Sequence, residues 1–146
     1  MLNTLIVYIG RAHPVIIHFP IAFLIVGAIG EVVGIWYKNR RLADFVSFSV
    51  IIGCAGAAAA VATGWLFALQ VHRPPDEQLL LSWHRWLGLG SLPFILTAAW
   101  SAGRWMHTSV SSQRWTRRGL VWMSAVAVIL TAHLGAAIVW GSDFWQ

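Results

Sequence analysis

The sequence predicts an all-α integral membrane protein, in which four helices form an up-down bundle. Its composition is the first observation: 58% of the 146 residues are hydrophobic and only 10% are charged, whereas soluble domains are about 25% charged. The second observation is four apolar segments that are each long enough to cross a bilayer, since a spanning helix needs roughly 20 residues. The remaining loops are short, so we expect a single membrane domain over residues 1–146.

The four predicted spans cover about residues 15–36, 45–69, 80–102 and 119–140. The first follows His13-Pro14, and proline suits the first position of a helix because no N–H is needed there. The second contains Gly56, Ala60 and Gly64 at four-residue spacing, which allows either close helix packing or room for a planar ligand. Prolines 74 and 75 end it, and the acidic residues that follow suit the start of the third span.

The net charge of +5 does not indicate a nucleic-acid partner, because the basic residues lie in the predicted loops and form no patch. The denser group follows the first span and separates the third from the fourth: Lys38, Arg40, Arg41, Arg104, Arg114, Arg117 and Arg118. The opposite side holds Arg11, Arg73 and Arg85. Because cytoplasmic loops carry an excess of Lys and Arg, we expect a bacterial inner-membrane protein with both termini in the periplasm. No cleavable signal is apparent at the N-terminus.

The tryptophans are expected to form two belts at the membrane interfaces, where their amphipathic rings sit at headgroup level. The outer belt would contain Trp65, Trp83, Trp86, Trp140 and Trp145. The inner belt would contain Trp36, Trp100, Trp105, Trp115 and Trp122. This arrangement predicts membrane anchoring.

Five of the six histidines fall toward the outer side of the predicted bundle: His13, His18, His72, His84 and His133. Imidazole is costly in lipid and is the commonest metal ligand, so such a group predicts a bound metal or cofactor. His133 is the deepest of them and is expected to face the bundle interior, with His18 and His84 approaching from other spans. His13 is expected at the rim, and His72 and His107 are expected to be loop residues.

The chemistry of these side chains favours haem over zinc. Structural zinc usually takes four close ligands, often including Cys, and the lone Cys54 also excludes a C-x-x-C-H attachment of haem. We therefore expect one or two non-covalent b-type haems, with copper as the alternative metal. His18 and His133 are the first choice of axial ligands, and His84 is an alternative or a ligand of a second haem.

Three further interpretations follow from the same residues. Arg73 and Arg85 lie at the level where haem propionates would emerge. Glu31 is the only carboxylate within a predicted span; it would either extend to the cytoplasmic interface or handle protons. The histidines could also hydrogen-bond within the bundle, which would make the protein a cofactor-free scaffold or anchor subunit.

Three stretches resemble the DUF2231 family of small bacterial membrane proteins. They are His13-Pro14-Val15-Ile16-Ile17-His18-Phe19-Pro20-Ile21-Ala22, His84-Arg85-Trp86-Leu87-Gly88 and Thr131-Ala132-His133-Leu134-Gly135. The resemblance covers nearly the whole chain and implies a four-helix membrane protein. Some members are fused to cytochrome c or Rieske-type domains, which implies a redox setting.

The resemblance therefore implies a haem b module that exchanges electrons between a quinone and a periplasmic cytochrome c or Rieske-type protein. The positions that match the family are His13, His18, His84 and His133, whereas His72 has no match. We expect a non-catalytic electron-transfer subunit of a larger respiratory or dehydrogenase complex, because this chain has no fused redox domain of its own.

Overall fold

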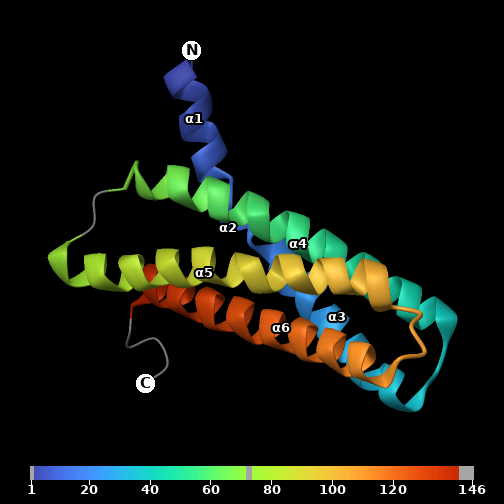
Figure 1. Cartoon of the computed structure of the whole chain (residues 1–146). Coiled ribbons are helices and arrows are strands. Elements are labelled where there is room, and N and C mark those ends of the chain that lie inside the picture. The colour runs from blue at the N-terminus through green and yellow to red at the C-terminus, as the bar shows by residue number, and fades with distance from the viewer. Residues whose placement is uncertain (1, 72–73, 142–146) are drawn as a thin grey trace.

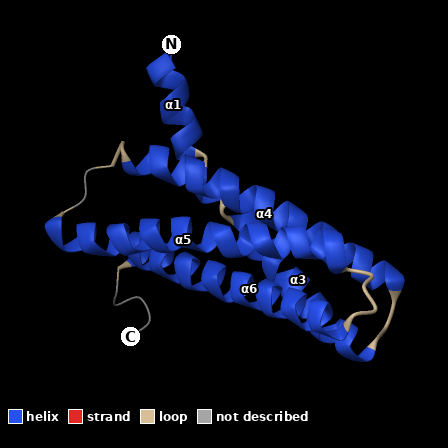
Figure 2. Ribbon diagram, viewed as in Figure 1, coloured by secondary structure: helices blue, strands red, loops and turns tan. Residues whose placement is uncertain are grey.

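The computed structural model of the chain describes residues 2–71 and 74–141, which form helices and no strand (Figure 2). The helices are α1 (Leu2–Arg11), α2 (His13–Ile16), α3 (His18–Trp36), α4 (Arg40–Ala68), α5 (Pro75–Trp105) and α6 (Ser111–Trp140). Helices α3 to α6 run alternately in opposite directions and pack side by side (Figure 1). The predicted all-α bundle is therefore confirmed.

The long helices extend beyond the predicted spans. Helix α4 begins at Arg40, where the side chain of Asn39 accepts a hydrogen bond of 2.8 Å from the backbone N–H of Arg41 and so caps the helix. Helix α6 begins at Ser111, well before residue 119. Arg114, Arg117 and Arg118, which were expected between the third and fourth spans, therefore lie within α6.

The N-terminal residues form a separate helix that the hydropathy pattern did not predict. Helix α1 ends at Arg11, α2 spans one turn from His13, and α3 begins only at His18. In Figure 1, α1 projects away from the bundle, while the bundle begins at α2 and α3. The change of direction coincides with Pro14 and Pro20, since proline removes a backbone donor from a helix.

Three stretches of the described residues are long and apolar enough to cross a membrane: Thr4–Trp36, Arg40–Ala68 and Ser111–Trp140. Helix α5, which contains the predicted third span, is not among them. Its Trp, Ser, Gly and Pro residues lower its mean hydropathy. Helix α5 nevertheless packs along both α4 and α6 as part of the bundle.

The centre of the bundle combines branched side chains with small ones. Leu24, Val50, Ile95 and Val121 are fully buried. A Cβ added to Gly53 would lie 2.8 Å from Cγ of Leu24, so α3 and α4 approach closely because glycine is there.

The outer surface of the bundle is apolar, as a lipid environment requires. The exposed tryptophans are Trp36, Trp83, Trp86, Trp100, Trp115 and Trp140. Trp122 differs, because its Nε1 donates to the carbonyl oxygen of Ala28 at 3.2 Å. Trp145 lies outside the described residues.

Candidate functional site

A cavity of about 220 Å³ lies at the end of the bundle where α2 begins. Helices α2 to α6 all contribute to its wall, and most of the lining residues are apolar or small. The small ones are Ala57, Ala60, Gly64, Ala68, Gly88, Ser91, Ala132, Gly135 and Ala136. The titratable side chains in the wall are His13, His84 and Arg85. This cavity is the candidate site.

His13 and His84 both line this cavity, and their rings lie edge to face. Their ring centroids are 6.4 Å apart and their planes are inclined by 76°. Both side chains are half-buried, and they come from α2 and α5, which are distant in the sequence. The sequence placed His13 at the rim and did not pair it with His84.

Hydrogen bonds orient both rings through Nδ1, and for His84 they also fix the tautomer. Nδ1 of His84 lies 2.9 Å from the carbonyl oxygen of Thr131; a carbonyl only accepts, so Nδ1 carries the proton. Nδ1 of His13 lies 3.4 Å from Oγ1 of Thr63, which already donates its own proton to Ala59 O at 2.8 Å. Nε2 of His84 therefore keeps an unprotonated lone pair, the state in which histidine ligates a metal.

Two glycines make room for the rings. A Cβ on Gly64 would lie 2.7 Å from Cε1 of His13, and a Cβ on Gly135 would lie 3.0 Å from Cε1 of His84. Both distances are shorter than ordinary contacts between carbon atoms, which are about 3.5–4.0 Å. The four-residue spacing that includes Gly64 thus accommodates a ring as well as helix packing.

Arg85 lies in the wall of the cavity and is only partly satisfied. Its guanidinium carbon is 4.0 Å from the centroid of the Trp65 ring, a cation–π contact. Its Nε is buried and has no hydrogen-bond partner among the described residues. A buried donor without a partner is costly, so this atom is suited to an anionic group inside the cavity.

His18 and His133 do not line the cavity, although they were the first choice of ligands. Both side chains are exposed on the bundle surface, so the prediction that His133 faces the interior is wrong. Helical phase explains the error: Thr131 and Gly135 line the cavity, and His133 is two residues from each, which is more than half a turn of an α-helix. Nδ1 of His18 lies 3.3 Å from the carbonyl oxygen of Val15 in the preceding turn.

Other predicted residues lie elsewhere. His72 and Arg73 lie outside the described residues. His107 lies between α5 and α6, as expected, with Nε2 2.8 Å from Oδ1 of Asp44. Within residues 2–71 and 74–141, no group of three or more His, Cys, Asp or Glu side chains could hold a metal ion. A metal at the candidate site would therefore depend on two imidazoles.

Glu31 lies at the opposite end of the bundle and is part of a buried ion pair. Its side chain is 3% exposed, so the expectation that it extends to the interface is wrong. Nε and Nη2 of Arg117 donate to its two oxygens at 2.7 and 2.8 Å. Nε of Arg118 lies 3.4 Å from Oε2. The carboxylate is thus committed to structural bonds that tie α3 to α6.

The helical architecture and the apolar outer surface define a membrane protein. A family model described as "Predicted membrane protein (DUF2231)" matches residues 11–144. The chain therefore belongs to the DUF2231 family. Neither a curated protein nor a solved structure matches it.

Proposed function

We propose that the protein is a membrane-embedded electron-transfer subunit that binds b-type haem between His13 and His84. These two residues replace the pair of His18 and His133 that the sequence favoured. The proposal keeps the cofactor, because the small residues of the cavity wall and the unpartnered Nε of Arg85 suit a metalloporphyrin. It changes the ligands, because among the histidines that the structure describes only His13 and His84 lie close together in one cavity.

One observation carries the proposal: two neighbouring imidazoles from different helices line the same cavity. Metal–nitrogen bonds of about 2 Å would place the centres of two imidazoles on opposite sides of a metal roughly 6 Å apart. The centroids of His13 and His84 are 6.4 Å apart. Their Nδ1 atoms are held by Thr63 and Thr131, as in metal sites where a second hydrogen bond orients the ligating ring.

The residues around the pair also suit haem. Glycine and alanine line the wall and leave room for a planar ring, and the unpartnered Nε of Arg85 could bond a propionate. The cavity of about 220 Å³ is smaller than the range of about 300–1,000 Å³ usual for organic ligands. Part of a porphyrin would therefore extend beyond the enclosed volume, between helices and toward the lipid.

Bound haem would supply reversible one-electron chemistry, and the protein would set its conditions. Thr63 and the backbone of Thr131 would orient the ligating rings, and Arg85 would hold a negative charge beside Trp65. The apolar wall would exclude water. Electrons would pass between a quinone and a periplasmic cytochrome c or Rieske-type protein, within a larger respiratory or dehydrogenase complex. The distribution of basic residues supports an inner-membrane location with both termini in the periplasm.

Copper is the second candidate, and the small volume of the cavity favours it. A single metal ion needs less space than a porphyrin, and imidazole suits copper. The two neighbouring imidazoles would then form an acceptor site for the ion. The unpartnered Nε of Arg85 weighs against copper, because a cation does not satisfy a donor.

The experiment is a pyridine haemochrome assay and metal analysis on protein purified from its native membrane. We expect stoichiometric haem b, and its loss in both His13→Ala and His84→Ala. The matched controls are His18→Ala and His133→Ala, which remove exposed imidazoles from the same chain and should retain the chromophore. Copper without iron would replace the haem proposal with the second candidate. Absence of both metals would leave the cofactor-free scaffold.

A further inference from the structure

A second and larger cavity lies at the opposite end of the bundle, beside the short connections after α3 and α5. Its volume is about 450 Å³, which falls within the range of about 300–1,000 Å³ typical of small-molecule sites. Five cationic side chains line it: Lys38, Arg40, Arg114, Arg117 and Arg118. We call this the basic pocket. It lies apart from the histidine pair and shares no lining residue with it.

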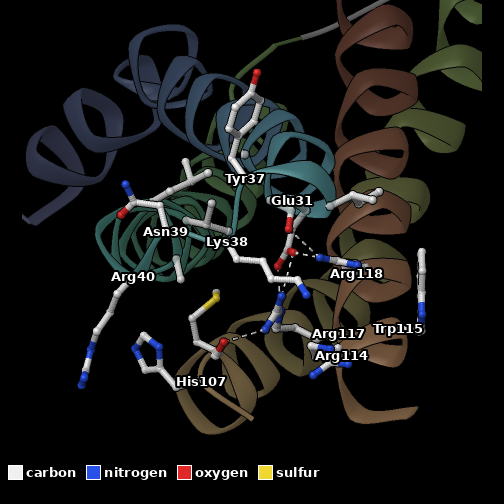
Figure 3. Close-up of a pocket in the computed structure, with 17 residues that line it drawn as sticks. Glu31, Tyr37, Lys38, Asn39, Arg40, His107, Arg114, Trp115, Arg117 and Arg118 are labelled. Atoms are coloured by element: carbon white, nitrogen blue, oxygen red, sulfur yellow. Dashed lines mark hydrogen bonds and ion pairs between the residues drawn. The ribbon is translucent and has the colours of Figure 1, made fainter. Parts of the chain in front are cut away.

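The carboxylates around the basic pocket do not neutralise it. Glu31 is the only acidic residue in its wall. Asp44 lies next to the wall, where it contacts His107. Even without Arg40, whose side chain points away from the cluster (Figure 3), four cations outnumber these two carboxylates, and the pocket keeps an excess of positive charge. Low-dielectric walls concentrate such a field more than a flat surface does.

Part of this charge is rigidly held. Arg117 is 4% exposed, and besides Glu31 its guanidinium donates to the carbonyl oxygens of Trp105 and Met106 at 3.0 and 3.1 Å. Arg118 donates to the carbonyl oxygen of Gly34 at 3.0 Å. In Figure 3 both guanidinium groups lie beside Glu31. These bonds hold the two guanidinium groups at the back of the pocket and use most of their donors.

Other cations retain donors for a ligand. Lys38 extends toward the ion pair in Figure 3, and its ammonium group has no hydrogen bond or ion pair within the described part of the chain. Arg114 uses Nη1 for the carbonyl oxygens of Thr108 and Ser109, which leaves its other nitrogens available. Arg40 points away from the cluster (Figure 3). Lys38 and Arg114 are therefore the cations most suited to contact a bound anion.

The basic pocket is also partly apolar. Ile35, Leu42, Val46 and Met106 contribute to the same wall as the cations. The cavity thus joins a cationic face to an apolar one at an end of the bundle, where lipid headgroups meet acyl chains. Basic pockets between membrane helices are suited to anionic headgroups. A free phosphate would use only the cationic face.

We propose that the basic pocket binds the phosphate-bearing headgroup of an anionic phospholipid. Lys38 and Arg114 would contact the phosphate, Arg118 would add charge from behind, and the apolar wall would hold the start of an acyl chain. This lipid would bridge α3, α4 and α6 at the end of the bundle that the basic residues assign to the cytoplasm. The proposal is independent of any cofactor at the histidine pair.

The test measures lipid binding to the full chain purified in a neutral detergent. Native mass spectrometry would titrate the protein with phosphatidylglycerol, with phosphatidylcholine and with inorganic phosphate. The variant is Lys38→Gln/Arg114→Gln, which avoids the buried ion pair. The matched control is Arg41→Gln/Arg104→Gln, because both residues are exposed at the same end and neither lines the pocket.

We expect phosphatidylglycerol to bind more tightly than phosphatidylcholine. Because each cation near an anionic lipid contributes about 1 kcal/mol, the pocket variant should weaken binding on the order of 30-fold, whereas the control should retain it. Equal losses in the two variants would mean that overall charge attracts the lipid, and the proposal would fail. It would also fail if inorganic phosphate bound as tightly as phosphatidylglycerol.

Discussion

The Glu31–Arg117 ion pair allows the sharpest test of what holds the bundle together. Glu31→Met removes the carboxylate and leaves a guanidinium that is 4% exposed without its charged partner. The wild-type carboxylate accepts two short N–H bonds from Arg117 and a longer one from Arg118. Breaking a buried pair by removing one partner costs about 3–5 kcal/mol, which for a chain of this size lowers Tm on the order of 10 °C.

The assay is thermal unfolding in detergent, followed by circular dichroism, for the wild type, Glu31→Met, Arg117→Met and the double variant. The double variant leaves no charge from the pair uncompensated. Its loss in free energy of unfolding should therefore be smaller than the sum of the losses in the two single variants, by a coupling energy above about 2 kcal/mol. Added salt should change this coupling little, since buried charges are weakly screened.

The control is the exposed pair of His107 and Asp44 at the same end of the bundle. Its atoms are also 2.8 Å apart, but the side chains are 47% and 60% exposed. Asp44→Asn should therefore cost no more than about 1 kcal/mol. If Glu31→Met proved no more destabilising than Asp44→Asn, burial would not determine the strength of this ion pair and the reasoning would be refuted.

Three further predictions concern the cavity and the helix contacts. Gly64→Ala should displace the ring of His13, because the new Cβ would lie 2.7 Å from Cε1; we expect loss of haem or copper in an otherwise folded protein, measured by absorbance and circular dichroism. Thr63→Val removes the acceptor of His13 Nδ1 and should weaken metal or haem affinity about 10-fold or more, while Thr63→Ser should preserve affinity in the same titration. Gly53→Ala should destabilise the bundle by about 1–3 kcal/mol through overpacking. The control is Gly34→Ala, whose new Cβ meets no atom within 4 Å and which should be neutral or stabilising by up to about 1 kcal/mol. A similar loss of Tm in both variants would contradict the packing argument.

The helices could be predicted because lipid exposure leaves a strong hydropathy signal. The same signal underestimated their lengths, since Arg117 continues α6 while bonding to Glu31. Charge complementarity offered a clue that hydropathy did not: Glu31 near the inner end of one span and Arg117 at the inner start of another lie at a similar depth. A buried pair between them follows from the cost of leaving either charge alone.

The candidate site could be predicted only in part. Residue depth placed the histidines at the correct end of the bundle, but depth says nothing about rotation of a helix around its axis. His133 and Thr131 have nearly the same depth, yet only Thr131 lines the cavity. The useful signal was the spacing of small residues, because Gly64 and Gly135 each lie against an imidazole ring.

The partners of the buried ion pair are separated by 86 positions in the chain, and this distance has a consequence for biogenesis. Glu31 is synthesised long before Arg117. When α3 and α4 have emerged from the ribosome, the nascent chain therefore carries a carboxylate whose cationic partner has not yet been synthesised. Such an intermediate must keep the start of its first hairpin at the aqueous boundary, or within an insertase, until α6 arrives. Synthesis and insertion of α6 would then be the event that locks the hairpins together.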